Sequence, residues 1–170
     1  PLSQTDSEML LKKTIEIIRK KKPAVIIFED YDKGALNKTV IEAIVAEAQK
    51  HNIPTTVDPK KNNFFHYRNV TLFKPNLKEL REGLKTDLEK PTAAALTKLA
   101  SEFASKQKIK SLLITLSEHG VYYYSKNEKG IIPAHIRNIS DVSGAGDTVI
   151  SVASLAIAAV KIVFSRLSPS

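Results

Sequence analysis

Short apolar runs alternate with amphipathic segments along most of the chain. Apolar side chains recur at helical spacing over residues 9–18, whereas residues 24–28 form a continuous apolar run that predicts a strand buried on both faces. The same patterns predict further helices over residues 36–49, 76–82, 92–106 and 148–160, and further strands over residues 53–57, 70–73, 111–115, 121–125 and 131–136. Alternating strands and helices predict an α/β fold around a mostly parallel sheet. A polar turn over residues 126–130 predicts an antiparallel edge, and with no internal repeat or linker we expect one domain over residues 1–170.

Polar clusters follow several of these runs at the point where each run ends. They comprise residues 30–34, 58–61, 76–79, 117–120 and 141–147. Ligands of open α/β sheets bind beyond the carboxyl ends of the strands, where such clusters meet. The sequence therefore predicts a ligand site on one rim of the sheet.

The run Gly144-Ala145-Gly146-Asp147 opens the last apolar helix. Small residues let the backbone approach a ligand closely, and the unpaired N–H groups of a helix start can face an anion. Such a clamp suits phosphoryl transfer, and a carboxylate beside it can accept a proton from an attacking hydroxyl. The alternative is a glycine-rich turn with Asp147 as a favourable first-turn charge. On these four residues alone, the structural interpretation is favoured.

Composition narrows the classes of partner. The 170 residues contain no cysteine, which excludes disulfides and thiolate metal sites and fits a reducing cytosol. The net charge of +8 is spread along the chain, and its densest run, residues 19–22, closes a predicted helix, where cations suit the helix dipole. Aromatic residues are few and stand apart from the basic ones, and no apolar run approaches the ~20 residues of a membrane span. We therefore expect a cytoplasmic protein without nucleic-acid or membrane partners.

Three strings together resemble the motifs of one family. DVSGAGDT resembles the C-terminal signature of the ribokinase/PfkB carbohydrate kinases. Asn76-Leu77-Lys78-Glu79 resembles their N-x-x-E motif, and residues 115–120 resemble their nucleotide-side loop, although Ser117 stands where many members carry glycine. The resemblance implies a ribokinase-like three-layer α/β/α fold and an ATP-dependent sugar or sugar-phosphate kinase. EDYDKG, VDPKK and LFKPNLKEL most resemble heptose-phosphate kinases over residues 25–159, although fructokinase-like members share several of these strings. This closer resemblance implies D-glycero-D-manno-heptose 7-phosphate, from lipopolysaccharide heptose synthesis, as one candidate substrate.

The resemblance also implies catalytic roles. Asp147 would take the proton from the sugar hydroxyl, and the backbone of Gly144, Ala145 and Gly146 would form the anion hole. Asn76 and Glu79 would hold Mg²⁺ through water, as suits an ion that dehydrates reluctantly. A helix-capping Asn with a capping-box Glu is a compatible alternative for this pair.

Further residues are assigned with structural alternatives kept open. Thr115, Ser117 and Gly120 would line the ATP phosphates, or form a tight hairpin. Two residues of the last polar cluster, Asp141 and Ser143, would match a monovalent-cation loop, although local turn hydrogen bonding is the favoured interpretation. Two lysines on the predicted rim, Lys33 and Lys60, are candidates to hold a substrate or nucleotide phosphate, or are ordinary exposed lysines.

The chain resembles only the C-terminal half of the family. The N-terminal half of members carries a glycine-rich sugar-binding segment and a β-sheet lid that often forms a homodimer, and residues 160–170 depart from the family as a divergent tail. We therefore expect a partial domain that is inactive alone, from an active parent. The alternative is a non-catalytic nucleotide-binding or remnant domain. A dehydrogenase-type domain is disfavoured, because no G-x-G-x-x-G follows the first strand.

Overall fold

One sheet of six strands organises the computed structural model, which describes residues 2–88, 92–134 and 144–167. The strands lie in sequence order and are β1 Ile26–Glu29, β2 Thr55–Asp58, β3 Leu72–Phe73, β4 Ser111–Thr115, β5 Val121–Ser125 and β6 Lys129–Ile132. Strands β1 to β4 are parallel, and β5 and β6 add an antiparallel edge. The mostly parallel sheet with an antiparallel edge is confirmed.

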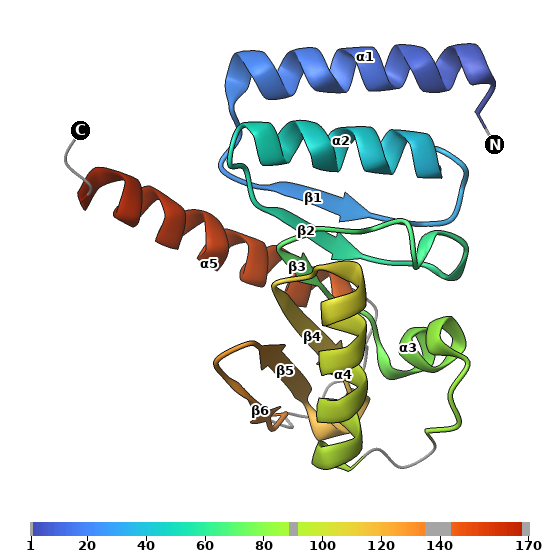
Figure 1. Cartoon of the computed structure of the whole chain (residues 1–170), viewed down its shortest axis with the longest axis vertical. Coiled ribbons are helices and arrows are strands. Elements are labelled where there is room, and N and C mark those ends of the chain that lie inside the picture. The colour runs from blue at the N-terminus through green and yellow to red at the C-terminus, as the bar shows by residue number, and fades with distance from the viewer. Residues whose placement is uncertain (1, 89–91, 135–143, 168–170) are drawn as a thin grey trace.

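Helices cover both faces of this sheet (Figure 1). They are α1 Gln4–Lys21, α2 Lys38–Lys50, α3 Leu77–Leu84, α4 Ala93–Gln107 and α5 Ala145–Leu167. Every residue of β2 is buried. Val57 belongs to the main core with residues of α2 and α4, whereas the Thr56 hydroxyl lies 2.7 Å from the hydroxyl of Ser154 on α5. Because neighbouring strand residues face opposite sides, α5 covers one face of the sheet and α2 and α4 cover the other.

Side-chain caps set several helix starts. Asn37 caps α2 and Thr92 caps α4, each by accepting a hydrogen bond from a backbone N–H of the first turn. Asn76 caps α3 in the same way, and the Glu79 carboxylate accepts a hydrogen bond from the Asn76 N–H. The predicted start of α3 is therefore confirmed together with its capping box.

Most predicted boundaries differ from the observed ones by a few residues, as strand β6 and helix α5 illustrate. Lys129 and Gly130 were placed in a turn, but they pair with Tyr124 and Tyr123 and belong to β6. The turn is shorter because Ser125 closes it: its N–H donates to the Glu128 carbonyl, and its hydroxyl accepts the Glu128 N–H. Helix α5 starts at Ala145, earlier than the predicted residue 148, because the small residues form its first turn.

Helix α1 packs on α2, away from the sheet (Figure 1). Glu47 of α2, whose side chain is only 4% exposed, joins the two helices. Its carboxylate accepts a bond of 2.5 Å from Arg19 of α1 and lies 3.4 Å from Lys50 and 3.3 Å from His51. The hydrogen bond from Arg19, opposed by burial and assisted by Lys50, lowers the pKa of Glu47 to about 2.

No helix among the described residues has both the length and the apolar character needed to span a bilayer.

Candidate functional site

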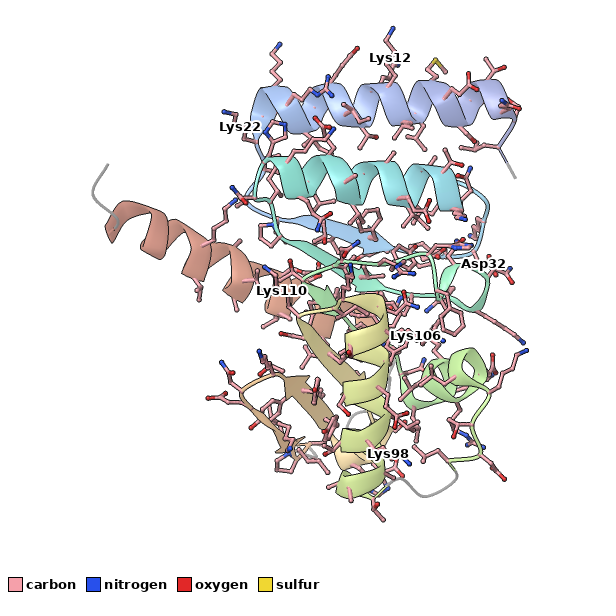
Figure 2. The ribbon with its side chains drawn as sticks, in the orientation of Figure 1. Lys12, Lys22, Asp32, Lys98, Lys106 and Lys110 are labelled. Atoms are coloured by element: carbon pink, nitrogen blue, oxygen red, sulfur yellow. The ribbon has the colours of Figure 1, made fainter. Side chains whose placement is uncertain are left out.

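The polar loops that follow the strands meet at one rim of the sheet. The Asp30 N–H donates to the Asp58 carbonyl at 3.1 Å, which joins the loops after β1 and β2. Asn76 forms a β-bridge with Thr115, which joins the loops after β3 and β4. In Figure 2, Asp32 marks this rim, toward which the arrows of β1 and β2 point, whereas Lys110 lies at the opposite end, before β4. The predicted gathering of loops is therefore present in the structure.

Four charged side chains, which we call the rim cluster, lie beneath these loops: Asp58, Lys60, Lys74 and Glu79. The ammonium of Lys74 lies 3.1 Å from Asp58 Oδ2, with the two side chains only 3% and 11% exposed. The ammonium of Lys60 lies 2.5 Å from Glu79 Oε1 and 3.7 Å from Asp58 Oδ1. The formal charges of the cluster sum to zero. Partial burial disfavours the charged form of Lys60, but Glu79 and Asp58 outweigh it and raise the Lys60 pKa.

The start of α5 lies directly over the rim cluster. A Cβ added at Gly146 would stand 3.5 Å from Lys74 Nζ and 3.7 Å from Asp58 Oδ2. Gly144 adopts a φ of 80°, which side chains rarely allow, and its carbonyl accepts the Thr148 N–H in the first helical bond. The N–H groups of residues 145–147 precede that bond and lack partners within the helix, so they offer donors to an anion.

Asp147, whose own N–H is one of these groups, is exposed in the same first turn. Tyr31, on the loop after β1, is 57% exposed. The negative charge of Asp147, followed by that of Glu29, raises the pKa of the Tyr31 phenol. The loop after β1 and the start of α5 therefore lie close enough for their charged groups to interact. The sequence did not single out Tyr31 as a residue of the site.

Asn76 lies beside the rim cluster and is hydrogen-bonded to its member Glu79. Asn76 Oδ1 accepts the Glu79 N–H at 2.7 Å, and Glu79 Oε2 accepts the Asn76 N–H at 2.9 Å. Over the ranges that the structure describes, no three His, Asp or Glu side chains converge as a metal site. Asp58 Oδ1 is nevertheless a buried oxygen without a hydrogen-bond donor in the structure. A small number of oxygen ligands from the protein fits Mg²⁺, which retains much of its water.

The nucleotide-side loop has a strained backbone. Ser117 adopts a φ of 53°, in the left-handed region, which gives a physical reason for glycine to be favoured at this position. Gly120 adopts a φ of 91°, and a Cβ there would stand 2.0 Å from the Ile132 carbonyl oxygen. The close approach of β6 therefore leaves room only for glycine at this position. This structural role is the one expected if the loop forms a tight hairpin. Thr115 ends β4, and its N–H donates to the Pro75 carbonyl.

The remaining predicted residues contribute less to this geometry. Lys33 is exposed on the loop after β1, and no ion pair joins it to another residue within the described ranges. Asp141 and Ser143 lie outside the described residues, so the monovalent-cation loop stays a prediction. Lys60 faces two carboxylates rather than solvent alone, which makes it more than an ordinary surface lysine.

Comparison with known proteins identifies the family. Residues 3–162 match the pfkB family carbohydrate kinases. The chain belongs to this family. The match confirms the resemblance predicted from the three motifs, and it begins well before residue 25.

Curated members of the pfkB family share more than a third of the matched residues. "Bifunctional protein HldE" of Campylobacter curvus is 36% identical over 158 residues, which are 92% of this chain and 32% of that protein. "Bifunctional protein HldE" of Geotalea uraniireducens is 37% identical over 135 residues, which are 79% of this chain and 27% of that protein. The chain therefore spans about a third or less of these relatives.

Solved structures of the pfkB type share the fold. Escherichia coli phosphofructokinase-2, in complex with potassium, matches with a TM-score of 0.77 at 20% identity, over 92% of this chain and 50% of that one. Arabidopsis thaliana ribokinase, complexed with ribose and ATP, matches with a TM-score of 0.66 at 17% identity, over 94% of this chain and 47% of that one. The ribokinase-like α/β fold is confirmed, and the chain covers about half of each neighbour.

Sequence reasoning missed Lys74 as a member of the site. Its side chain is the most buried of the rim cluster and lies beneath Gly146. One signal in the sequence could have pointed to it: Lys74 directly follows the buried strand β3. A lysine that is buried almost always has a charged partner. The partner, Asp58, lies 16 residues earlier on a different strand, so local pattern could not reveal it.

Proposed function

We propose that this chain is the phosphate-handling part of a kinase that transfers the terminal phosphoryl group of ATP to a sugar or sugar-phosphate hydroxyl. The observation that carries the proposal is the start of α5, whose first N–H groups lack partners within the helix and which lies, with Asp147, directly over the rim cluster. Family membership supports the reaction class.

Asp147 would act as the general base. Its carboxylate is exposed at the first turn of α5 and can accept the proton of a hydroxyl that attacks a phosphorus atom held nearby. The N–H groups of residues 145–147 would donate to the transferring phosphoryl oxygens, whose negative charge the helix start favours. Both groups lie in one helical turn, which fixes their relative position.

Asn76 and Glu79 would hold Mg²⁺ through water, and the ion would neutralise charge on the phosphates of ATP. The capping box keeps both side chains at the rim, so the structural and metal-binding interpretations are compatible. Thr115 and Ser117 would lie along the nucleotide phosphates, with Gly120 shaping that loop. Lys60 and Lys33 would hold a substrate or nucleotide phosphate as point charges. Asp141 and Ser143 would hold a monovalent cation.

The substrate would be D-glycero-D-manno-heptose 7-phosphate. EDYDKG, VDPKK and LFKPNLKEL, the strings that resemble heptose-phosphate kinases, include the ends of β1, β2 and β3 and the loops that follow them. The relatives named bifunctional protein HldE are consistent with that branch. A homodimer of the complete protein and a cytoplasmic location belong to the same proposal.

The chain alone would be inactive, since it corresponds to about half of phosphofructokinase-2. The same coverage keeps a second candidate open, a folded nucleotide-binding domain without catalysis. The exposed carboxylate of Asp147 in the first turn of α5 favours the catalytic candidate, because nucleotide binding alone gives that carboxylate no role.

The deciding experiment is Asp147→Asn in a protein that joins this chain to a family sugar-binding half. We expect kcat to fall ~10²–10⁴-fold with little change in ATP affinity, because Asn keeps the size of Asp but cannot accept the proton. If Asp147 were only a helix-start charge, it would contribute ~0.3–1 kcal/mol of stability and turnover would be nearly normal. Turnover within a few fold of the unmodified protein would decide against the base.

A further inference from the structure

Both carboxylate oxygens of Glu79 are already occupied by protein donors. Oε2 accepts the Asn76 N–H at 2.9 Å, and Oε1 contacts the Lys60 ammonium at 2.5 Å. The Glu79 side chain is 13% exposed and that of Lys60 is 36% exposed, so the carboxylate is the more buried member of the pair. A hydrated cation that approaches Glu79 must therefore compete with the Lys60 ammonium for this carboxylate.

A second acceptor for Lys60 lies within reach. Asp58 Oδ1 is buried, lacks a hydrogen-bond donor, and stands 3.7 Å from Lys60 Nζ. A buried carboxylate oxygen without a donor is energetically unfavourable, and a shift of the ammonium of about 1 Å would reach hydrogen-bonding distance. Lys74 already occupies the other oxygen, Oδ2, so Oδ1 is the oxygen left to receive Lys60.

We propose that Lys60 is an exchangeable counter-ion of Glu79, which moves to Asp58 Oδ1 when Mg²⁺ binds. This inference rests on the proposed function, because it takes Glu79 as a metal-holding residue. Lys60 is a positioning residue in this scheme: it holds the Glu79 carboxylate ready and blocks cations that arrive without nucleotide.

The charges of the rim cluster explain why the metal would require the nucleotide. The two carboxylates and two ammonium groups sum to zero, so a divalent cation alone would leave an excess of two positive charges in a partly buried site. The phosphates of a nucleotide would offset that excess. Metal alone should therefore bind the unmodified chain weakly.

The test measures Mn²⁺, a paramagnetic substitute for Mg²⁺, binding to the purified chain without nucleotide, from the electron paramagnetic resonance signal of the free ion. Lys60→Met removes the competing ammonium, and we expect at least about tenfold tighter Mn²⁺ binding. Lys61→Met is the matched control: Lys61 is the next residue, its side chain is 70% exposed, and it lies 3.9 Å from Glu82. Removing that screened charge should change Mn²⁺ affinity by less than about twofold.

A further substitution locates the effect. Adding Glu79→Gln to Lys60→Met should abolish the gain, because glutamine keeps a carbonyl oxygen for the capping box but loses the negative charge. Thermal melts establish that each variant is folded, and Lys60→Gln replaces Lys60→Met if the latter is not. Mn²⁺ binding to folded Lys60→Met or Lys60→Gln that is no tighter than to Lys61→Met would overturn the exchange, as would a gain that survives Glu79→Gln. Neither result depends on turnover, so the role of Asp147 is tested separately.

Discussion

Replacing Lys74 by methionine tests how much the rim cluster contributes to the fold. The Lys74 ammonium lies 3.1 Å from Asp58 Oδ2, and the two side chains are 3% and 11% exposed. Methionine keeps most of the length and apolar volume of lysine and removes the charge. Asp58 would then stay buried, with Lys60 Nζ at 3.7 Å from its other oxygen as the nearest positive charge.

The expected loss follows from this geometry. Breaking a buried ion pair by removing one partner costs ~3–5 kcal/mol, because the other charge is left uncompensated. Since Lys60 partly compensates Asp58, we expect the lower end, about 3 kcal/mol of unfolding free energy. For a domain of this length, at roughly 2–4 °C per kcal/mol, that corresponds to a fall in Tm of about 6–12 °C.

Urea titrations followed by circular dichroism measure the change. Lys78→Met is the control, because the Lys78 side chain is 83% exposed and lies 4.0 Å from Glu82; it should change the unfolding free energy by less than about 0.5 kcal/mol. Combining Lys74→Met with Asp58→Leu should recover much of the loss, since no charge is then left unpaired at that point. A Lys74→Met variant within about 1 kcal/mol of the unmodified chain would refute the reasoning.

Two further predictions concern acid stability and activity. Because the pKa of Glu47 is lowered from 4.5 to about 2, its contribution to stability is fully present above pH 4.5 and is lost as the pH falls toward 2. Melting curves of the unmodified chain and Glu47→Gln should therefore differ most above pH 4.5 and converge toward pH 2; a constant difference would contradict the pairing. The purified chain, given ATP, Mg²⁺ and a heptose 7-phosphate, should release no more ADP in a coupled assay than its Asp147→Asn variant. Sugar-dependent ADP release by the unmodified chain alone would show that it is active by itself.

Local signals account for the elements that sequence reasoning placed well. Asn76 followed by Glu79 three residues later predicts a capped helix, and the two side chains form both bonds of a capping box. Strands β4 and β5 were predicted with the observed bounds, because apolar residues and a glycine define them locally. The turn before β6 was predicted to be too long, because Lys129 and Gly130 are residue types typical of loops. Their pairing with β5 makes them part of the strand.

The site was predictable in outline and not in its contacts. Because parallel strands present their carboxyl ends at one rim, the clusters after β1, β2, β3 and β4 could be placed together from the sequence. The burial of Asp58 could not be predicted, because its nearest partner, Lys74, reaches it from the loop after β3 and long side chains have many rotamers. Whether a charged residue is buried depends on such long-range pairing.

The rim cluster also changes the meaning of the small residues at the start of α5. Small residues there are usually explained by the close approach of a ligand, but Gly146 has a close neighbour on its protein side as well. A Cβ at Gly146 would contact Lys74 Nζ at 3.5 Å and Asp58 Oδ2 at 3.7 Å, so alanine would fit and a larger side chain would press on the ion pair. Because Asp147 is the next residue, a side chain larger than alanine in place of Gly146 would displace the proposed base and also disturb the buried pair beneath it.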